Sequence, residues 1–236
     1  MNNIIRKRKS IRKYEDAPLS AATINMIMAQ LTTLVPLYSS IGYSIETTPK
    51  TKGLFNVKAP HYFLFTSEKK DGYLENIGFI GQQLDLFLSE AGIGTCWLGA
   101  AKPTEKQATT LPYVIGMSFG NAAEPLYRDT SEFKRKPLSA VSEGNDERLE
   151  AARLAPSGLN AQNWYFVAYN GNIHCYRKKT VLGFLNRMAC IDMGIALYHI
   201  AAESHHFNFI TDTNAPVRKG YIYMGTVGGL SADSLA

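Results

Sequence analysis

One order of segments occurs twice along this chain of 236 residues, and it limits the folds that the chain can adopt. An apolar strand, a long helix that contains glycine and a closing strand follow one another over residues 60–120 and again over residues 164–228. Within the helices, residues 75–81 (ENIGFIG) are echoed by residues 191–197 (IDMGIAL). Two copies are too few for a solenoid, whereas a duplicated unit can fold into one pseudo-symmetric globule, by analogy with two-fold dimers. We therefore expect a duplicated α+β fold.

The two pseudo-halves, residues 1–140 and 141–236, are expected to form a single globule over residues 1–236. The helical spacing of apolar residues predicts two long central helices, over 75–90 and about 192–204, with mixed β-sheets around them. Gly78 and Gly81 lie three residues apart inside the first of these helices. Because each glycine costs about 1 kcal/mol against alanine in a helix, their presence indicates that another element packs very close there.

Shorter elements follow from capping and strand signals. Ser20 is expected to be the N-cap of a helix that Pro36 ends, and Asn145 the N-cap of a helix over 147–155. Residues 37–58 are polar and mixed, which is typical of turns or a short hairpin. The expected strands are 61–66, 95–99 (as a strand or a loop), 113–119, 164–169 and 221–225.

Composition excludes several classes of protein. Hydrophobic residues make up 45% of the chain and charged residues 19%, which excludes an intrinsically disordered chain. No apolar run reaches the roughly 18–20 residues of a membrane span, and the basic N-terminus lacks the apolar core of a secretory signal. The three cysteines (Cys96, Cys175 and Cys190) have no metal-ligand spacing, so we expect no metal site, and free thiols in a reducing cytoplasm. The net charge of +5 suits an anionic ligand.

Three segments are candidates for binding chemistry. In residues 8–12 (RKSIR), Arg8, Ser10 and Arg12 alternate and can point the same way as an anion grip, although a solvated basic tail is the simpler interpretation. Residues 155–164 (APSGLNAQNW) offer Ser and amide side chains to a polar ligand, or form an ordinary turn. Residues 91–99 (AGIGTCWLG) allow backbone N–H groups to approach a ligand, or simply end a helix.

Taken together and in this order, these segments resemble the FMN-dependent nitroreductase family. The matching stretches are RKSIRKYEDAPLS near the N-terminus, ENIGFIGQQLDLFLSEAGIGTCWLG in the middle, RKPL at 135–138 and ARLAPSGLNAQNW in the second half. The chain is most similar to the single-chain TM nitroreductase type, which carries two fused halves in one polypeptide. The resemblance covers residues 6–228 and implies a nitroreductase-like fold with the two halves as a pseudo-dimer.

The resemblance implies a role for five basic or hydroxyl residues. Arg8 and Ser10 correspond to the grip on the phosphate and ribityl chain of FMN. Arg12 corresponds to the cation beside the pyrimidine end of the flavin ring. Arg135 and Lys136 correspond to distal phosphate contacts. A positive charge near the pyrimidine end favours the anionic reduced flavin.

Two further segments are implied to enclose the flavin ring. The backbone of Leu98 and Gly99 corresponds to the segment that faces flavin N5. Pro156, Ser157 and Asn160 correspond to the loop that the other half contributes. The second half has no counterpart of GIGTCWLG, and the first half has no counterpart of PSGLN, so we expect one FMN site per chain, at the junction of the halves.

The function implied is that of an enzyme, an FMN-dependent oxidoreductase that passes hydride from NADH or NADPH to a nitroaromatic, a quinone or a similar small-molecule acceptor. One alternative is a flavin enzyme of another reaction, such as a metabolite dehydrogenase. An alternative of another class is a nucleic-acid-binding protein that uses the basic N-terminus. Of these functions we favour the oxidoreductase, and we therefore expect neither a nucleic acid nor a membrane as partner. A monomer and a homodimer that completes its sites in trans both remain possible.

Overall fold

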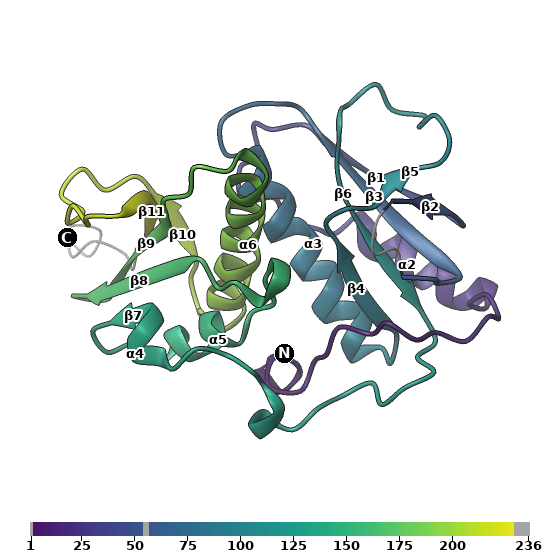
Figure 1. Ribbon diagram of the computed structural model, residues 1–236, viewed down its shortest axis with the longest axis horizontal. Helices are drawn as coiled ribbons and strands as arrows, with labels where there is room; N and C mark the ends of the chain where they lie inside the picture. The colour runs from purple at the N-terminus through teal and green to yellow at the C-terminus, as the bar shows by residue number, and fades with distance from the viewer. Residues whose placement is uncertain (1, 54–56, 229–236) are drawn as a thin grey trace.

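The structure is a computed structural model that describes residues 2–53 and 57–228 (Figure 1). Two β-sheets lie at opposite ends of the molecule, and the long helices α3 (Tyr73–Glu90) and α6 (Gly183–Ala202) lie between them. The expected α+β fold with central long helices is therefore confirmed. None of the helices in the described ranges has the length and apolar character needed to cross a membrane.

The first sheet is antiparallel and belongs to the first half of the chain. Its order is β1 (Tyr43–Thr48), β3 (His61–Ser67), β6 (Tyr113–Gly120) and β4 (Gly94–Leu98). Helix α2 (Ala21–Leu31) packs on α3. A separate two-stranded ribbon joins β2 (Thr51–Lys52) to β5 (Lys102–Pro103). Residues 37–58 were expected to form turns or a short hairpin, and the hairpin alternative is wrong, because strands β1 and β2 pair with β3 and β5 and not with each other. Residues 54–56 lie outside the described residues.

The second sheet has the order β10 (Asn208–Ile210), β11 (Tyr221–Gly228), β9 (Asn172–Lys178), β8 (Trp164–Tyr169) and β7 (Ser142–Glu143). All neighbours are antiparallel except β7 and β8. The short helices α4 (Leu138–Val141) and α5 (Arg148–Leu154) and the 3₁₀ turns η1 (Thr130–Glu132) and η2 (Gly158–Asn160) complete this part of the chain. Helix α1 (Asn2–Ile5) begins the described chain.

The two sheets share one topology, but the strands that correspond between them are not the ones expected. The order β1-β3-β6-β4 corresponds to β8-β9-β11-β10, since in each sheet the strand before the long helix pairs with the last strand of the unit. Strand β3 therefore corresponds to β9, whereas the sequence comparison matched it to the strand at 164–169. Strand β9 was not expected, because its residues NIHCYRK are largely polar. The division of the chain at residues 140 and 141 stays a prediction.

The two long helices approach each other through glycine. A Cβ atom on Gly78 would lie 2.1 Å from the carbonyl oxygen of Ile191, and one on Gly194 would lie 1.9 Å from the carbonyl oxygen of Glu75. In both cases the facing carbonyl belongs to the residue three positions before the other glycine. This reciprocity is the contact pattern of a two-fold interface, here formed within one chain. On the same face of α3, Gly81 makes room for the indole of Trp97, so the close packing expected at both glycines is confirmed.

The helix ends differ from the expected ones in specific ways. The Ser20 side chain accepts a hydrogen bond from the Thr23 N–H and caps α2 as expected, but α2 ends at Leu31, before Pro36. At α5 the first free N–H, that of Arg148, is bound by Asp146 Oδ1 at 2.9 Å, so the expected cap Asn145 is wrong. Helix α6 begins at residue 183, nine residues before the expected start, and its first two turns are exposed or half-buried.

A small second core fixes the N-terminus where the candidate site lies. Ile4 and Ile5 of α1 pack with Leu86 of α3 and with Phe133. Two residues of α5, Ala151 and Leu154, complete this cluster. The connection after β6 and the basic N-terminal segment therefore meet beside the junction of α3 and α5.

Candidate functional site

The basic segment 8–12 is held along its length and is not a solvated tail. Its backbone forms isolated bridges from Arg8 to Tyr127 and from Ser10 to Thr95. The Ile11 N–H donates to the Thr95 carbonyl at 2.8 Å. The segment therefore lies between β4 and the connection that follows β6.

The guanidinium of Arg8 is fully buried in an ion pair. Arg8 Nε lies 3.0 Å from Asp85 Oδ2, and both side chains are 0% exposed. Arg8 Nη2 also contacts Ser10 Oγ at 3.3 Å, as their alternation in sequence suggested. Asp85 accepts two more hydrogen bonds, from Thr95 Oγ1 and from Gln82 Nε2. A buried ion pair is tolerated only when its remaining groups are satisfied in this way.

Gln82 connects this ion pair to β4 and α6. Its amide nitrogen donates to Asp85 at 2.6 Å and lies 3.2 Å from His199 Nε2, and its amide oxygen accepts from Trp97 Nε1 at 3.1 Å. Burial, followed by the charges of Arg8 and Arg135, lowers the pKa of His199 to about 3. The neutral ring donates from Nδ1 to the Ala151 carbonyl and accepts at Nε2. Arg8 is thus held rigidly from three elements.

Two further guanidinium groups, those of Arg128 and Arg135, act on the Arg8 guanidinium of this ion pair. Arg128 and Arg135 both lie over the ring of Phe133, with Cζ atoms 4.6 Å and 5.6 Å from its centroid. Burial, then Arg8, Arg128 and Arg153, lower the pKa of Arg135 to about 10. Burial and Arg8 also lower the pKa of Arg128. Because the neighbouring arginines lower the pKa values of Arg128 and Arg135, positive charge exceeds negative charge around Phe133.

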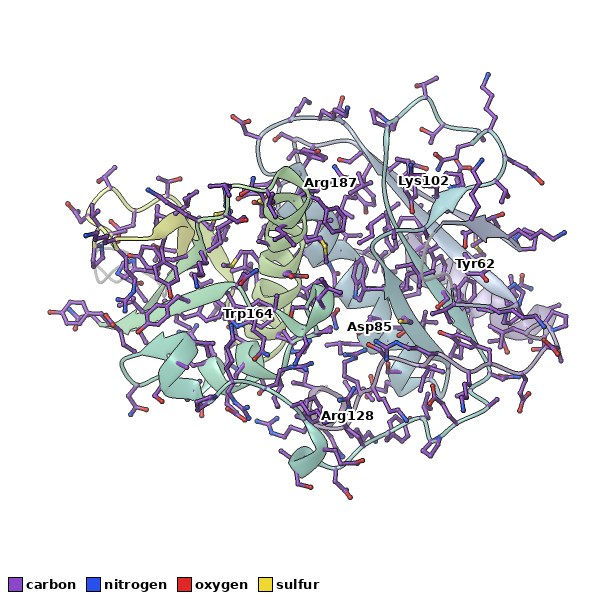
Figure 2. The ribbon with its side chains drawn as sticks, in the orientation of Figure 1. Tyr62, Asp85, Lys102, Arg128, Trp164 and Arg187 are labelled. Atoms are coloured by element: carbon purple, nitrogen blue, oxygen red, sulfur yellow. The ribbon has the colours of Figure 1, made fainter. Side chains whose placement is uncertain are left out.

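Each of the three arginines keeps an unused donor. Arg8 Nη1, Arg128 Nε and Arg135 Nε are buried and have no hydrogen-bond partner among residues 2–53 and 57–228. Figure 2 labels Arg128 on the connection after β6 and Asp85 on α3. Arg128 was not among the expected site residues, because it stands in the charged stretch 121–146 outside the RKPL motif that singles out Arg135. We call Arg8, Arg128 and Arg135 the arginine cluster.

The PSGLN segment is folded onto the strand-like stretch that carries Arg135. Arg135 Nη1 donates to Asn160 Oδ1 at 2.7 Å, and the Lys136 N–H donates to Gln162 Oε1 at 2.8 Å. Ser157 Oγ accepts from the Gln162 N–H at 3.0 Å. The amide side chains of Asn160 and Gln162 are thereby used inside the protein. The structure brings Arg135, Lys136 and Asn160 together, while the Lys136 ammonium points at the carbonyls of Ala161 and Gln162.

The end of the segment 91–99 (AGIGTCWLG) and the PSGLN loop both lie close to one side chain, that of Met188. Met188 Cε of α6 lies 4.0 Å from the position of a Cβ on Gly99 and 1.9 Å from that of a Cβ on Gly158. Leu98 and Pro156, which precede these glycines, are buried. Gly99 and Gly158 therefore lie beside the same side chain of α6, whereas the Leu98 side chain is buried in a separate cluster with Tyr62, Cys96 and Ala101.

Two charged residues complete the description of the site. Arg12 is exposed, and its guanidinium contacts the Ser10 carbonyl at 3.5 Å. Asp192 of α6 is 5% exposed, and its Oδ1 accepts from the Gly158 N–H at 2.9 Å. Burial raises the pKa of Asp192 to about 7, although the hydrogen bond from Gly158 lowers it. Asp192 was not among the expected site residues, because in sequence it is one polar residue in a helix.

Comparison with known proteins agrees with this architecture. The sequence model of the family described as "Putative TM nitroreductase" matches residues 1–204. A nitroreductase structure from Thermotoga maritima MSB8 has a TM-score of 0.62 at 23% identity and covers 95% of this chain and 90% of its own. An FMN-dependent nitroreductase from Clostridium difficile R20291 has a TM-score of 0.42 at 18% identity, covering 58% of this chain and 98% of its own. No curated protein matches the chain.

The Thermotoga maritima structure and this chain share a fold, since the likeness extends over nearly the whole of both. The family match includes the whole first sheet, strands β7, β8 and β9 of the second sheet, both long helices and all three candidate segments. The chain therefore belongs to the Putative TM nitroreductase family.

Proposed function

We propose that the protein is an FMN-dependent oxidoreductase that uses NADH or NADPH as donor and a nitroaromatic, a quinone or a similar small molecule as acceptor. The observation that carries the proposal is the arginine cluster, whose buried N–H donors lack partners. An unsatisfied buried donor is costly, and a phosphate with several charged acceptor oxygens removes that cost. Family membership supports an oxidoreductase in general. The donor and the acceptor are parts of the proposal.

The residues fit FMN in a defined arrangement. Arg8, Arg128 and Arg135 would bind the phosphate, with Ser10 at the start of the ribityl chain. Leu98 and Gly99 would present backbone to one side of the ring, and Pro156 and Ser157 would approach it from the other half. Asn160 would act through the loop, because its side chain already binds Arg135. Lys136 would likewise fasten the loop, since its ammonium binds two loop carbonyls.

When bound, FMN would supply the capacity to accept and release a hydride. The protein's contribution is binding, orientation and electrostatics. The exposed guanidinium of Arg12 can stabilise negative charge at the pyrimidine end of the ring. The rigid network through Asp85 and Gln82 fixes Arg8 so that little reorganisation accompanies binding.

The identity of the cofactor is the first expected result. Protein purified with its flavin is expected to be yellow, and heat should release FMN, identified by chromatography, at one FMN per chain. The stoichiometry follows because the chain contains one RKSIR, one GIGTCWLG and one PSGLN. Release of FAD, or no binding of added FMN, would overturn the proposal.

Arg128 provides a sharper expected result. Replacing Arg128 by Met keeps its apolar contact with Phe133 but removes one cation and one unused donor. We expect FMN binding to weaken by about 1.5–3 kcal/mol, or roughly ten- to a hundredfold in Kd. Quenching of flavin fluorescence during titration measures this.

The matched control is Arg218→Met, because Arg218 also stacks on an aromatic ring (Tyr165, at 3.8 Å) but binds Glu143 in the second sheet. The control should leave the Kd for FMN unchanged. Equal affinities for the Arg128 variant and the control would contradict a phosphate role for the arginine cluster.

A further inference from the structure

The loop over residues 157–162, which we call the cofactor loop, has a backbone that needs support. Leu159, Asn160 and Gln162 have φ angles of 54°, 54° and 48°, in the left-handed region that residues other than glycine rarely adopt. Such a conformation persists only where surrounding contacts hold it. Hydrogen bonds from Arg135 and Lys136 support the loop from one side.

Asp192 supports the cofactor loop from the other side. Its Oδ1 accepts the Gly158 N–H at 2.9 Å from within α6. Met188 lies one helical turn before Asp192, hence on the same helix face, and its Cε fills the space next to Gly158. The side of α6 that meets the cofactor loop therefore carries one thioether and one carboxyl group.

The carboxyl group of Asp192 has no cation to balance its charge. Within the described residues no cation acts on it, the Gly158 N–H is its hydrogen-bond partner, and the titratable group coupled to it is the Cys190 thiol, whose pKa burial raises to about 12. Charged groups on α6 itself and on the segments around it have other partners, although Arg177 keeps one buried Nε without a hydrogen bond in the described residues. The pairs are Arg187 with Tyr73 and Val114, Arg177 with Asn186, Glu75 with Cys190, Arg135 with Asn160, Arg148 with Asp146, and Arg153 with Glu150.

A buried carboxylate without a cation is unfavourable, so the closed loop prefers the neutral acid. Burial accordingly raises the pKa of Asp192 to about 7. If the cofactor loop opens, water reaches the carboxyl group and the ionised form becomes favourable again. By linkage, the conformation with the higher proton affinity is the one that protons stabilise.

We propose that Asp192 is a positioning residue that must be protonated for the cofactor loop to close fully, so that binding of FMN is coupled to uptake of a proton. The proposal rests on the proposed function, because FMN is the ligand over which the loop would close. Ionisation of Asp192 would loosen the loop without any change in the arginine cluster.

The test is a fluorescence titration with FMN at pH 6 and pH 8. For the wild-type protein we expect the contribution of Asp192 to raise the Kd for FMN about tenfold from pH 6 to pH 8. Linkage gives this factor for a group whose pKa is near 7 when it is buried and near 4 when it is exposed. In Asp192→Asn the amide oxygen still accepts from Gly158 and cannot ionise. The ratio of the wild-type Kd to the variant Kd should therefore rise about tenfold from pH 6 to pH 8. The ratio cancels the titration of the FMN phosphate, which is common to both proteins.

A second measurement counts the protons directly. Calorimetric titration with FMN at pH 7.5, in two buffers of different ionisation enthalpy, should show more proton uptake by the wild type than by Asp192→Asn. The matched control is Asp212→Asn, because Asp212 also accepts a backbone N–H, from Asn214 at 2.8 Å, but lies in the second sheet's outer loop. The Asp212→Asn control should take up as many protons on binding FMN as the wild type does.

A constant Kd ratio between pH 6 and pH 8, with equal proton uptake, would overturn the role of Asp192 while leaving FMN binding intact. Failure of every protein to bind FMN at either pH would instead overturn the proposed function. Asp192→Ala removes the acceptor and should weaken FMN binding about tenfold or more, since the Gly158 N–H is left unsatisfied. If that variant fails to fold, the comparison of the wild type with Asp192→Asn still tests whether Asp192 couples FMN binding to proton uptake.

Discussion

Replacing Gly194 by Ala is expected to destabilise the protein by about 3 kcal/mol or more, because the new methyl group has no space. Its Cβ would lie 1.9 Å from the Glu75 carbonyl oxygen and 2.7 Å from its carbon. These are backbone atoms of α3, so no side-chain rotation relieves the contact and the two helices have to separate. The gain of about 1 kcal/mol in helix propensity offsets only part of this cost.

Thermal unfolding followed by circular dichroism measures the effect, and a fall in Tm of roughly 10 °C corresponds to it for a chain of this size. The matched control is Gly183→Ala in the same helix, where a Cβ meets nothing within 4 Å. This control should stabilise the protein by up to about 1 kcal/mol. Equal Tm values for the two variants would contradict the close approach of α3 and α6.

The glycine contact shows which part of the fold could be predicted from the sequence. The echo between residues 75–81 and 191–197 aligns Gly78 with Gly194, and these two glycines form the reciprocal contact. The signal was strong because a glycine inside a helix has a cost that close packing explains. Strand β9 carried no such signal, since the four consecutive residues 173–176 are all buried and give no alternation, while His174 and Arg177 make the segment polar in sequence.

The candidate site shows a different limit. The segments that carry Arg8, Gly99 and Ser157 are short and contiguous, so they could be found from the sequence. Arg128 and Asp192 could not, because their importance comes from neighbours distant in sequence. Arg128 gains its importance from Arg8, 120 residues away, and Asp192 from Gly158, 34 residues away. Burial without a counter-charge is a tertiary property, and no local pattern of residue types reports it.

Asp192 also determines how the stability of the FMN-bound protein, in which the cofactor loop is closed, depends on pH. Its pKa is raised from the ordinary value of 3.8 to about 7, mainly by burial. Between these values the unfolded chain has lost the proton that the folded protein keeps, so stability is full below about pH 4 and falls as pH rises toward 7. The shift corresponds to about 4 kcal/mol, all of which is lost above pH 7.

Asp192→Asn should remove this loss, because an amide stays neutral. We expect the variant's advantage in unfolding free energy over the wild type to be about 2.5 kcal/mol larger at pH 8 than at pH 5, measured by urea denaturation at a saturating concentration of FMN. Asp146→Asn is the control of opposite sign. Although burial raises the pKa of Asp146, hydrogen bonds from Arg148 hold it below its ordinary value, so its contribution is present at pH 8 and that variant should be less stable there. An advantage of Asp192→Asn that is equal at both pH values would mean that Asp192 is hydrated in the folded protein, and the cofactor loop would then have no proton-dependent support from α6.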